Sequence, residues 1–347
     1  MAYVELHACS AFSFLRGGSF PEHIAEAAAD RGMAAAALLD RNGVYGSQRF
    51  SVAAREKNVR PIVGCELTME DGSVLPVLVK TRAGYANLCS LLTQAHLRSA
   101  VKGECAVQWK ELPEFAEGLV VLLGSARFQR AGDRILRSRT LKSSRRQNVV
   151  TSTLKACAPQ TPAGYAQRLI DSLGQKNVYV ELQRHFLRGE EQQNRALLDL
   201  AEQFRLPIIA TNGVQYATAQ GREVLDVFTC IREHTHLDAA GKLLAQNAER
   251  HLKSDREMRA LFRDLPEAIT NTERLAERLE FSLENIGYAF PDFPVPAGHD
   301  MNSFLRTITW FGAQQRYEAV SVKVRRQIEE ELALITRLGF SGYFLIV

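Results

Sequence analysis

Two side chains near the start of the chain have the types and the spacing of metal ligands. His7 follows a short, mainly apolar run, and Cys9 begins the Ser/Gly-rich segment 9–18. Residues two apart in a strand lie on the same face, so both side chains are expected to point to one place. Imidazole and thiolate groups bind zinc and other transition metals. The pair therefore predicts the beginning of a metal site, if further ligands join it.

Further polar residues stand where short apolar runs end. Strands are predicted over 3–6, 34–40, 60–67, 74–80, 118–124, 178–182 and 207–211, and the first helix is expected to begin after Ser19 as its N-cap. Apolar strands separated by helices are typical of a parallel sheet that is covered on both faces. The polar residues at the carboxyl ends of these strands are His7, Cys9, Asp40, Glu66, Ser125, Asn212 and Gln215.

The predicted fold class is α/β, with a barrel favoured over a doubly wound sheet. Both folds bind ligands at the carboxyl ends of their strands. The chain contains neither the GxGxxG fingerprint nor a P-loop, and it lacks the GxSxG elbow of serine hydrolases. Beyond about residue 220 the pattern becomes helical, with helices expected over 222–234, 255–262, 265–279, 301–317 and 322–338.

The net charge of +4 arises in one segment. Residues 127–146 contain eight basic residues and one acidic residue, so the rest of the chain is slightly acidic. A solvated insertion is the simpler interpretation, and contact with nucleic-acid phosphates is the alternative. The candidates for such contact are Arg134, Arg137, Arg139, Lys142, Arg145 and Arg146.

The cysteines and the apolar runs indicate a cytoplasmic protein that does not associate with a membrane. Six cysteines are scattered without CxxC spacing, which favours reduced thiols. No apolar run reaches 18 residues, and the first residues lack the basic and apolar regions of a signal peptide.

Eight short segments carry a resemblance to a known family. In chain order they are HACSAFSFLRGG (7–18), LDRNGVYG (39–46), VGCEL (63–67), ELQRHFLRGEEQQNRALLDLAE (181–202), ATNGVQYAT (210–218), FTCIREHT (228–235), FPDFPVPAG (290–298) and LGFSGYFLIV (338–347). The order resembles the N-terminal region of bacterial DNA polymerase III alpha subunits, where a PHP (polymerase and histidinol phosphatase) domain precedes the palm. The segments RHFLRGEEQ, CIREHT and NAERHLKS (247–254) most resemble the error-prone, damage-tolerant paralogue.

This resemblance implies a division of the chain. A distorted (β/α)7 PHP barrel is expected over 1–220, with an Arg-rich insertion at about 127–160. A helical extension over 221–286 and a Pro-rich connector with the first part of the palm over 287–347 are expected to follow. The apolar run 342–347 lacks a polar tail, so we expect the chain to be the front part of a longer protein.

The implied function is error-prone, template-directed DNA synthesis in replication and repair, with DNA and other polymerase or mutasome subunits as partners. Palm carboxylates of the family hold two Mg²⁺ ions for nucleotidyl transfer. No Asp-x-Asp sequence occurs in this chain. We therefore expect Mg²⁺ to act only in the full-length polymerase, and not in this chain by itself.

The resemblance also implies a PHP site for up to three metal ions that hydrolyses phosphoesters, and here the sequence departs from the family. His7 and Glu66 match ligands, whereas Cys9 stands in place of a histidine. The remaining positions of the pattern are taken by Arg16, Arg41, Ser125, Gly213 and Gln215. Zinc sites need three or four protein ligands.

We therefore expect a vestigial, non-catalytic site in which Arg41 pairs with Glu66 or Asp40. A single Zn²⁺ on His7, Cys9 and Glu66 is the less favoured outcome. Two alternatives to the scaffold role stay open: a metal-dependent phosphoesterase or 3′–5′ exonuclease, and a DNA-binding module that uses the Arg-rich segment.

Four other histidines are predicted to be structural. His96 is the only candidate for a ligand between Glu66 and Ser125, but it lies in a helical pattern. The resemblance places His185 near the mouth of the site. His234 and His236 have metal-like spacing at an expected helix end, where histidine favours the helix dipole.

Overall fold

The computed structural model describes residues 3–99, 105–124, 161–286 and 292–347. Two compact units are present, Met1–Glu284 and Asn285–Val347. Ser125 and the six basic candidates of the Arg-rich segment lie outside the described residues, so the predictions made for them remain predictions. The domain boundary expected near residue 220 also remains a prediction, although the residues around it are described.

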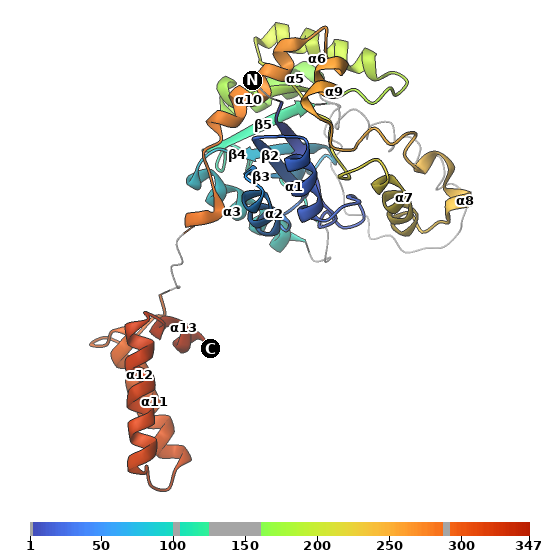
Figure 1. Ribbon diagram of the computed structural model, residues 1–347. Helices are drawn as coiled ribbons and strands as arrows, with labels where there is room; N and C mark the ends of the chain where they lie inside the picture. Colours follow the sequence, from blue (N-terminus) through green and yellow to red (C-terminus); the bar gives the residue numbers. More distant parts are fainter. Residues whose placement is uncertain (1–2, 100–104, 125–160, 287–291) are drawn as a thin grey trace, which may run out of the picture. The chain divides into compact units, whose positions relative to one another are not determined.

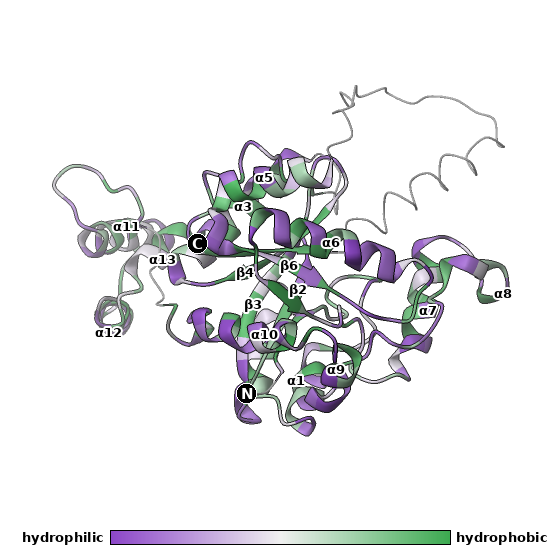
Figure 2. Cartoon of the chain, turned by 90° about the horizontal axis from the view of Figure 1, so that it is seen from above, coloured by the Kyte–Doolittle hydropathy of each residue, from purple (hydrophilic) through white to green (hydrophobic). Residues whose placement is uncertain are grey.

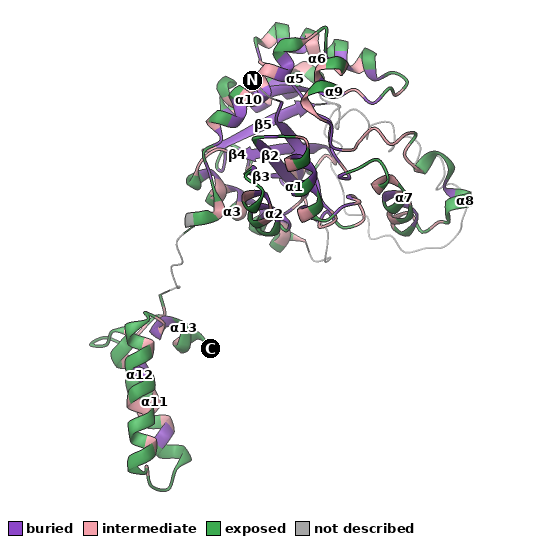
Figure 3. Cartoon of the chain, viewed as in Figure 1, coloured by how far each residue is buried: buried purple, intermediate pink, exposed green. Residues whose placement is uncertain are grey.

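The first unit is built on a curled seven-stranded sheet in which the strands follow one another in chain order. Its strands are β1 (Glu5–Ala8), β2 (Ala35–Arg41), β3 (Arg60–Thr68), β4 (Val74–Val79), β5 (Leu119–Gly124), β6 (Val178–Leu182) and β7 (Ile208–Ala210). The sheet is buried between helices (Figures 1 and 3). The predicted α/β class is confirmed, and all seven predicted strands are present.

The expectation of a wholly parallel sheet is wrong for one strand. β4 pairs antiparallel with both β3 and β5. The reason is the short connection after β3, since only a hairpin fits there, whereas a parallel return needs a crossover.

The two edges of the sheet are joined just beyond β7. The peptide of Val214 exchanges hydrogen bonds with β1, from Cys9 N to Val214 O at 2.9 Å and from Val214 N to His7 O at 2.8 Å. The sheet therefore curls toward a barrel, and the residues after β7 lie beside those after β1.

Helices cover the sheet and extend the first unit. They are α1 (Pro21–Asp30), α2 (Ser47–Glu56), α3 (Arg82–Arg98), α5 (Pro162–Leu173), α6 (Glu190–Phe204), α7 (Gly221–Arg232), α8 (Leu237–Ala240), α9 (Asp255–Leu261) and α10 (Pro266–Arg278). One prediction fails locally: Phe20, not Ser19, is the N-cap of α1. The Ser19 hydroxyl instead accepts a hydrogen bond from Ala217 N at 2.9 Å.

The hydrophobic core has two parts because strand residues alternate between the two faces of the sheet. The larger cluster lies between the strands and the surrounding helices. The smaller one contains Leu6, Leu39 and Ile62, and Leu275 of α10 packs into it. Figure 2 shows the strands as predominantly hydrophobic beneath amphipathic helices.

The second unit contains α11 (Met301–Arg316), α12 (Val322–Arg337) and α13 (Ser341–Ile346). The guanidinium of Arg325 lies 5.1 Å from the ring centre of Trp310. Most of the apolar run 342–347 lies in α13, and most of its large side chains are exposed, with Phe344 at 47%. None of the described helices combines the length and the apolar character needed to cross a bilayer.

Candidate functional site

Three strands bring charged side chains together at one end of the curled sheet. His7 of β1 lies between Glu66 of β3 and Glu181 of β6. Its Nδ1 is 2.6 Å from Glu181 Oε1, and its Nε2 is 2.9 Å from Glu66 Oε1. Both ring nitrogens therefore donate to carboxylates. Burial by itself would lower the pKa of His7, but Glu181 and then Glu66 outweigh it and raise that pKa to about 10.

Arg41 completes this network from the end of β2. Its Nε and Nη2 lie 2.7 and 2.5 Å from Glu66 Oε2. Of the two partners that the sequence left open for Arg41, the structure shows Glu66 and not Asp40. The Nη1 atom of Arg41 is buried and has no hydrogen-bond partner among the described residues. A guanidinium group therefore occupies the position for which the family resemblance implies a ligand histidine.

Glu181 is a member of the site that sequence reasoning missed. It is fully buried, and its Oε1 also accepts hydrogen bonds from Thr211 Oγ1 at 2.5 Å and Gln183 Nε2 at 3.1 Å. Although burial opposes ionisation, His7 lowers the pKa of this carboxyl. The available signal was the strand VYVEL, which ends in glutamate just as VGCEL does.

A second missed carboxylate lies at the base of the same network. Glu5 is fully buried and accepts hydrogen bonds from Tyr3 Oη at 2.6 Å, His7 N at 2.8 Å and Asn212 N at 3.0 Å. Burial raises the pKa of Glu5 to about 7, against the opposing effect of these donors. Glu5 therefore links β1 to the segment that follows β7.

Asp40 has a different role from the one the strand-end pattern suggested. Its carboxylate accepts hydrogen bonds from Ser10 N at 2.9 Å, Ser13 Oγ at 2.8 Å and Gly46 N at 2.8 Å. These contacts fix the Ser/Gly-rich turn after β1 against the turn after β2. Asp40 therefore shapes the rim of the site and does not line its cavity.

Arg250 occupies the space beside Gly213, where the family resemblance implies an aspartate. Gly213 has φ +51°, and a Cβ there would lie 2.6 Å from Gln183 Nε2 and 2.8 Å from Arg250 Nη1. Arg250 Nη1 lies 3.3 Å from both Gln183 Oε1 and Gly213 O. A carboxylate side chain at position 213 would thus require the amide and the guanidinium to move.

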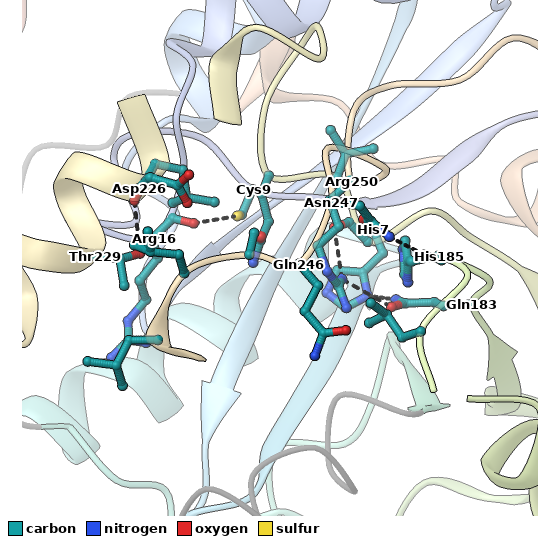
Figure 4. A pocket seen from close by; sticks show the side chains of 18 of the residues that line it. His7, Cys9, Arg16, Gln183, His185, Asp226, Thr229, Gln246, Asn247 and Arg250 are labelled. Carbon is teal, nitrogen blue, oxygen red and sulfur yellow. Dashed lines mark hydrogen bonds between the residues drawn. The ribbon is translucent and has the colours of Figure 1, made fainter. Parts of the chain in front are cut away.

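His7, Arg41, Glu66, Gly213 and Arg250 line one cavity of about 340 Å³, whereas Glu5, Asp40 and Glu181 do not. Figure 4 shows Arg16 with Asp226 and Thr229 of α7 on one side, and Arg250 with Gln183 and His185 on the other. Of the predicted site residues, those that line the cavity are His7, Cys9, Arg16, Arg41, Glu66, Gly213 and Gln215. Sequence reasoning missed Gln183, Arg232 and Arg250. All three lie in segments that carry the family resemblance, but none of them occupies a metal-ligand position of the pattern.

Of the other histidines singled out in the sequence, His185 and His96 make structural hydrogen bonds. The side chains of His234 and His236 make no hydrogen bond with the described residues. His185 also lines the cavity, but its Nδ1 is 2.8 Å from Glu190 Oε1 and its Nε2 is 2.9 Å from Asn212 O. Mainly through burial, the pKa of His185 is lowered. His96 Nε2 donates to Asn42 O at 2.8 Å. His236 is the N-cap of α8 and makes no side-chain cap hydrogen bond.

The donor set does not fit the metal centre that the resemblance implies. A metal-bound histidine needs a free ring nitrogen, and both nitrogens of His7 are engaged with carboxylates. Burial raises the pKa of the Cys9 thiol, which disfavours the thiolate that a metal requires. Across the described residues, no group of three or more His, Cys, Asp or Glu side chains has metal-binding geometry.

Comparison with known proteins places this site in a family. The PHP domain profile matches residues 5–185, which include β1 to β6 and the His7–Glu66–Glu181 cluster. This chain belongs to the PHP domain family. A solved structure described as a putative metal-dependent phosphoesterase from Bifidobacterium adolescentis is also similar, at 15% identity and a TM-score of 0.41, over 74% of this chain and 95% of that one. That score is too low to bear on the function of this PHP domain.

Curated relatives extend the similarity beyond the PHP domain to the whole chain. The error-prone DNA polymerase of Symbiobacterium thermophilum is 34% identical over all of this chain and 31% of its own length. The error-prone DNA polymerase of Mycobacterium tuberculosis is 35% identical with the same coverage. That of Caulobacter vibrioides is 35% identical over 99% of this chain and 29% of its own length. The chain thus spans about a third of the curated relatives it matches.

Proposed function

We propose that this chain is the N-terminal part of an error-prone DNA polymerase of the DNA polymerase III alpha type, with a PHP domain that acts as a non-catalytic scaffold. Similarity over the whole chain to three polymerases of that name supports the assignment. DNA is the partner that this assignment implies, and other subunits would join through the full-length polymerase. Mg²⁺ would serve the palm, and the PHP site would hold no catalytic metal.

One observation carries the scaffold role: His7 lies between two carboxylates while Arg41 occupies a ligand position. Metal-assisted hydrolysis needs an open coordination position on a metal that the protein holds. Here the two glutamates that could ligate are satisfied by cations of the protein itself. The network therefore stabilises the carboxyl ends of the strands.

The scaffold role is tested by the metal content and the nuclease activity of the purified chain. We expect no stoichiometric metal by mass spectrometry, and no hydrolysis of a 3′-end-labelled DNA strand or of a phosphomonoester when Mn²⁺ or Zn²⁺ is added. One equivalent of zinc that resists chelation, or a hydrolysis that the substitution His7→Ala abolishes, would overturn the proposal in favour of a phosphoesterase or exonuclease.

The polymerase assignment has a separate test. The gene downstream of codon 347 would be sequenced, and the complete product assayed for primer extension opposite undamaged and damaged templates. We expect Mg²⁺-dependent, error-prone extension by the complete product and none by residues 1–347. A complete product that contains no Asp-x-Asp sequence and extends no primer would refute the assignment.

A further inference from the structure

The outer face of α7 carries an apolar stripe, formed by Val224, Val227, Phe228 and Ile231. These residues have the i, i+3, i+4 and i+7 spacing that places side chains on one side of a helix. A stripe of this kind normally faces the core of its own domain. Here Val224 and Val227 are 44% exposed and Ile231 is 53% exposed, whereas Phe228 is half-buried. The stripe thus has the pattern of a buried helix face but is open to solvent.

The PHP domain packs against the opposite side of α7. Leu225 and Thr229 on that side are buried. The turn after β1 closes onto the helix, since a Cβ at Gly18 would lie 3.5 Å from Leu225 Cβ. The guanidinium of Arg232 also donates to Leu15 O at 2.7 Å. One side of α7 therefore fixes the helix to the domain, and the apolar stripe on the other side remains available.

Two further exposed leucines follow α7 in the chain. Leu237 of α8 is 51% exposed, and Leu243 is 52% exposed. Figure 3 shows α7 and α8 at the edge of the first unit, away from the sheet. Single apolar side chains are common on protein surfaces, but a group of them at helical spacing marks an interaction surface.

The size of this surface indicates what covers it. A stable interface between separate proteins uses roughly 20–30 residues on each partner. The exposed side chains of α7 with the two leucines are few beside that number. A segment of the same polypeptide needs less contact area, because the covalent connection gives it a high effective concentration. The size therefore favours an occupant within the same polypeptide.

The curated relatives contain such a segment. They align with all or nearly all of this chain, which spans only about a third of their length. We propose that the apolar stripe of α7 is a docking face for the polymerase segment that follows residue 347, which packs an apolar face of its own against it. This inference rests on the proposed function, because it needs the longer product. It goes further by assigning the stripe to an interface inside that product.

Cysteine labelling of the complete gene product and of residues 1–347 tests the proposal. Val227→Cys replaces valine by another small apolar side chain, so both proteins should fold. Reaction with a maleimide is followed peptide by peptide with mass spectrometry, which separates the new thiol from the native cysteines. We expect labelling to be at least about tenfold slower in the complete product, as for a docked state that is populated about 90% of the time.

Val52→Cys is the matched control. Val52 is 40% exposed on α2, which is close to the exposure of Val227. It belongs to no apolar stripe, since its neighbours three and four residues away are polar, namely Gln48, Arg49, Arg55 and Glu56. Val52→Cys should therefore be labelled equally fast in the complete product and in residues 1–347.

The double variant Val224→Cys/Val227→Asp provides a second readout. A carboxylate on the stripe would be buried without a partner on docking, which opposes it. Labelling of the complete product should then return to the rate seen with residues 1–347. Since the aspartate is exposed in residues 1–347, it should leave the Tm of that protein unchanged.

The proposal is overturned if Val227→Cys is labelled equally fast in both proteins, or if Val52→Cys is slowed as much. Dimers of residues 1–347 that Val227→Asp dissociates would also overturn it, because a second copy would then be the occupant. Primer extension without protection of the stripe would overturn this inference alone. Protection in a complete product that extends no primer would support it and refute the polymerase assignment. A gene that ends at codon 347 would overturn both.

Discussion

The substitution Glu181→Gln tests whether a buried ion pair holds the strand ends together. Glu181 is fully buried, and its closest contact is the 2.6 Å hydrogen bond to His7 Nδ1. Removing one partner of a buried pair leaves the other uncompensated, which costs about 3–5 kcal/mol. Glutamine keeps the size of the side chain, so the loss would come from the charge and not from a cavity.

The pKa of His7 gives an independent magnitude. That pKa is about 10 in the folded protein, against 6.5 for the free side chain. The two pKa values differ by about 3.5, and a pKa difference of one corresponds to about 1.4 kcal/mol. The raised pKa of His7 therefore corresponds to about 5 kcal/mol of stabilisation. Because Glu66 continues to support the imidazolium in the variant, we expect Glu181→Gln to lower the free energy of unfolding at pH 6 by about 3 kcal/mol.

The pH dependence fixes the sign of the effect. A raised pKa means that the stabilisation from His7 is fully present below pH 6.5 and is lost as the pH rises through 10. The pKa of Glu181 is lowered, so its contribution is present above 4.5 and is lost as the pH falls further. The stability difference between wild type and variant should therefore be largest between about pH 5 and 6.5.

Chemical denaturation at several pH values measures this difference, and NMR titration of His7 follows its pKa directly. Glu202→Gln is the matched control, because Glu202 is exposed on α6 and should change stability by less than about 0.5 kcal/mol. A loss for Glu181→Gln below about 1 kcal/mol, or a difference that does not depend on pH, would refute the ion-pair reasoning.

Three further substitutions test the surroundings of the site. Burial raises the pKa of Glu5 to about 7, so the free energy of unfolding of the wild type should fall by about 3 kcal/mol as the pH rises from 4.5 through 7. Glu5→Gln should remove this pH dependence in denaturation measurements, and an unchanged pH dependence would contradict the expectation. Gly124→Ala places a Cβ 2.2 Å from Glu181 Oε2, so we expect a loss of about 1–3 kcal/mol by thermal or chemical denaturation, whereas an unchanged Tm would show that the carboxylate moves freely. The Asp40 carboxylate accepts hydrogen bonds from three residues, so the NH₂ group of asparagine in Asp40→Asn would face at least one of their donors. We expect the free energy of unfolding to fall by about 1–3 kcal/mol in the same assay. Unchanged stability would argue that the turn after β1 needs no anion.

The sequence alone determined the strands, the main helices and the family. Local patterns suffice for this, because runs such as AAAALLD and GLVVLLG are apolar on both faces and the eight short segments carry the family resemblance. The sequence also placed seven of its nine candidate site residues around one cavity, since the carboxyl ends of neighbouring strands converge. Its errors were local, as with the antiparallel β4 and the cap of α1.

Only the tertiary structure decided how the charges are shared. Glu5, Glu181 and Arg250 belong to no sequence motif that predicts a partner, and they come from segments up to about 245 residues apart. Whether Arg41 pairs with Glu66 or with Asp40 depends on the register of β2 against β3, which places Arg41 opposite Glu66. A one-residue shift would move Arg41 to the other side of the sheet. The opening His7 and Cys9 predicted a metal site from spacing. The fold instead provides two carboxylates for the imidazole and surrounds the cavity with arginines, because electrostatic pairing is set by distances that only folding brings about.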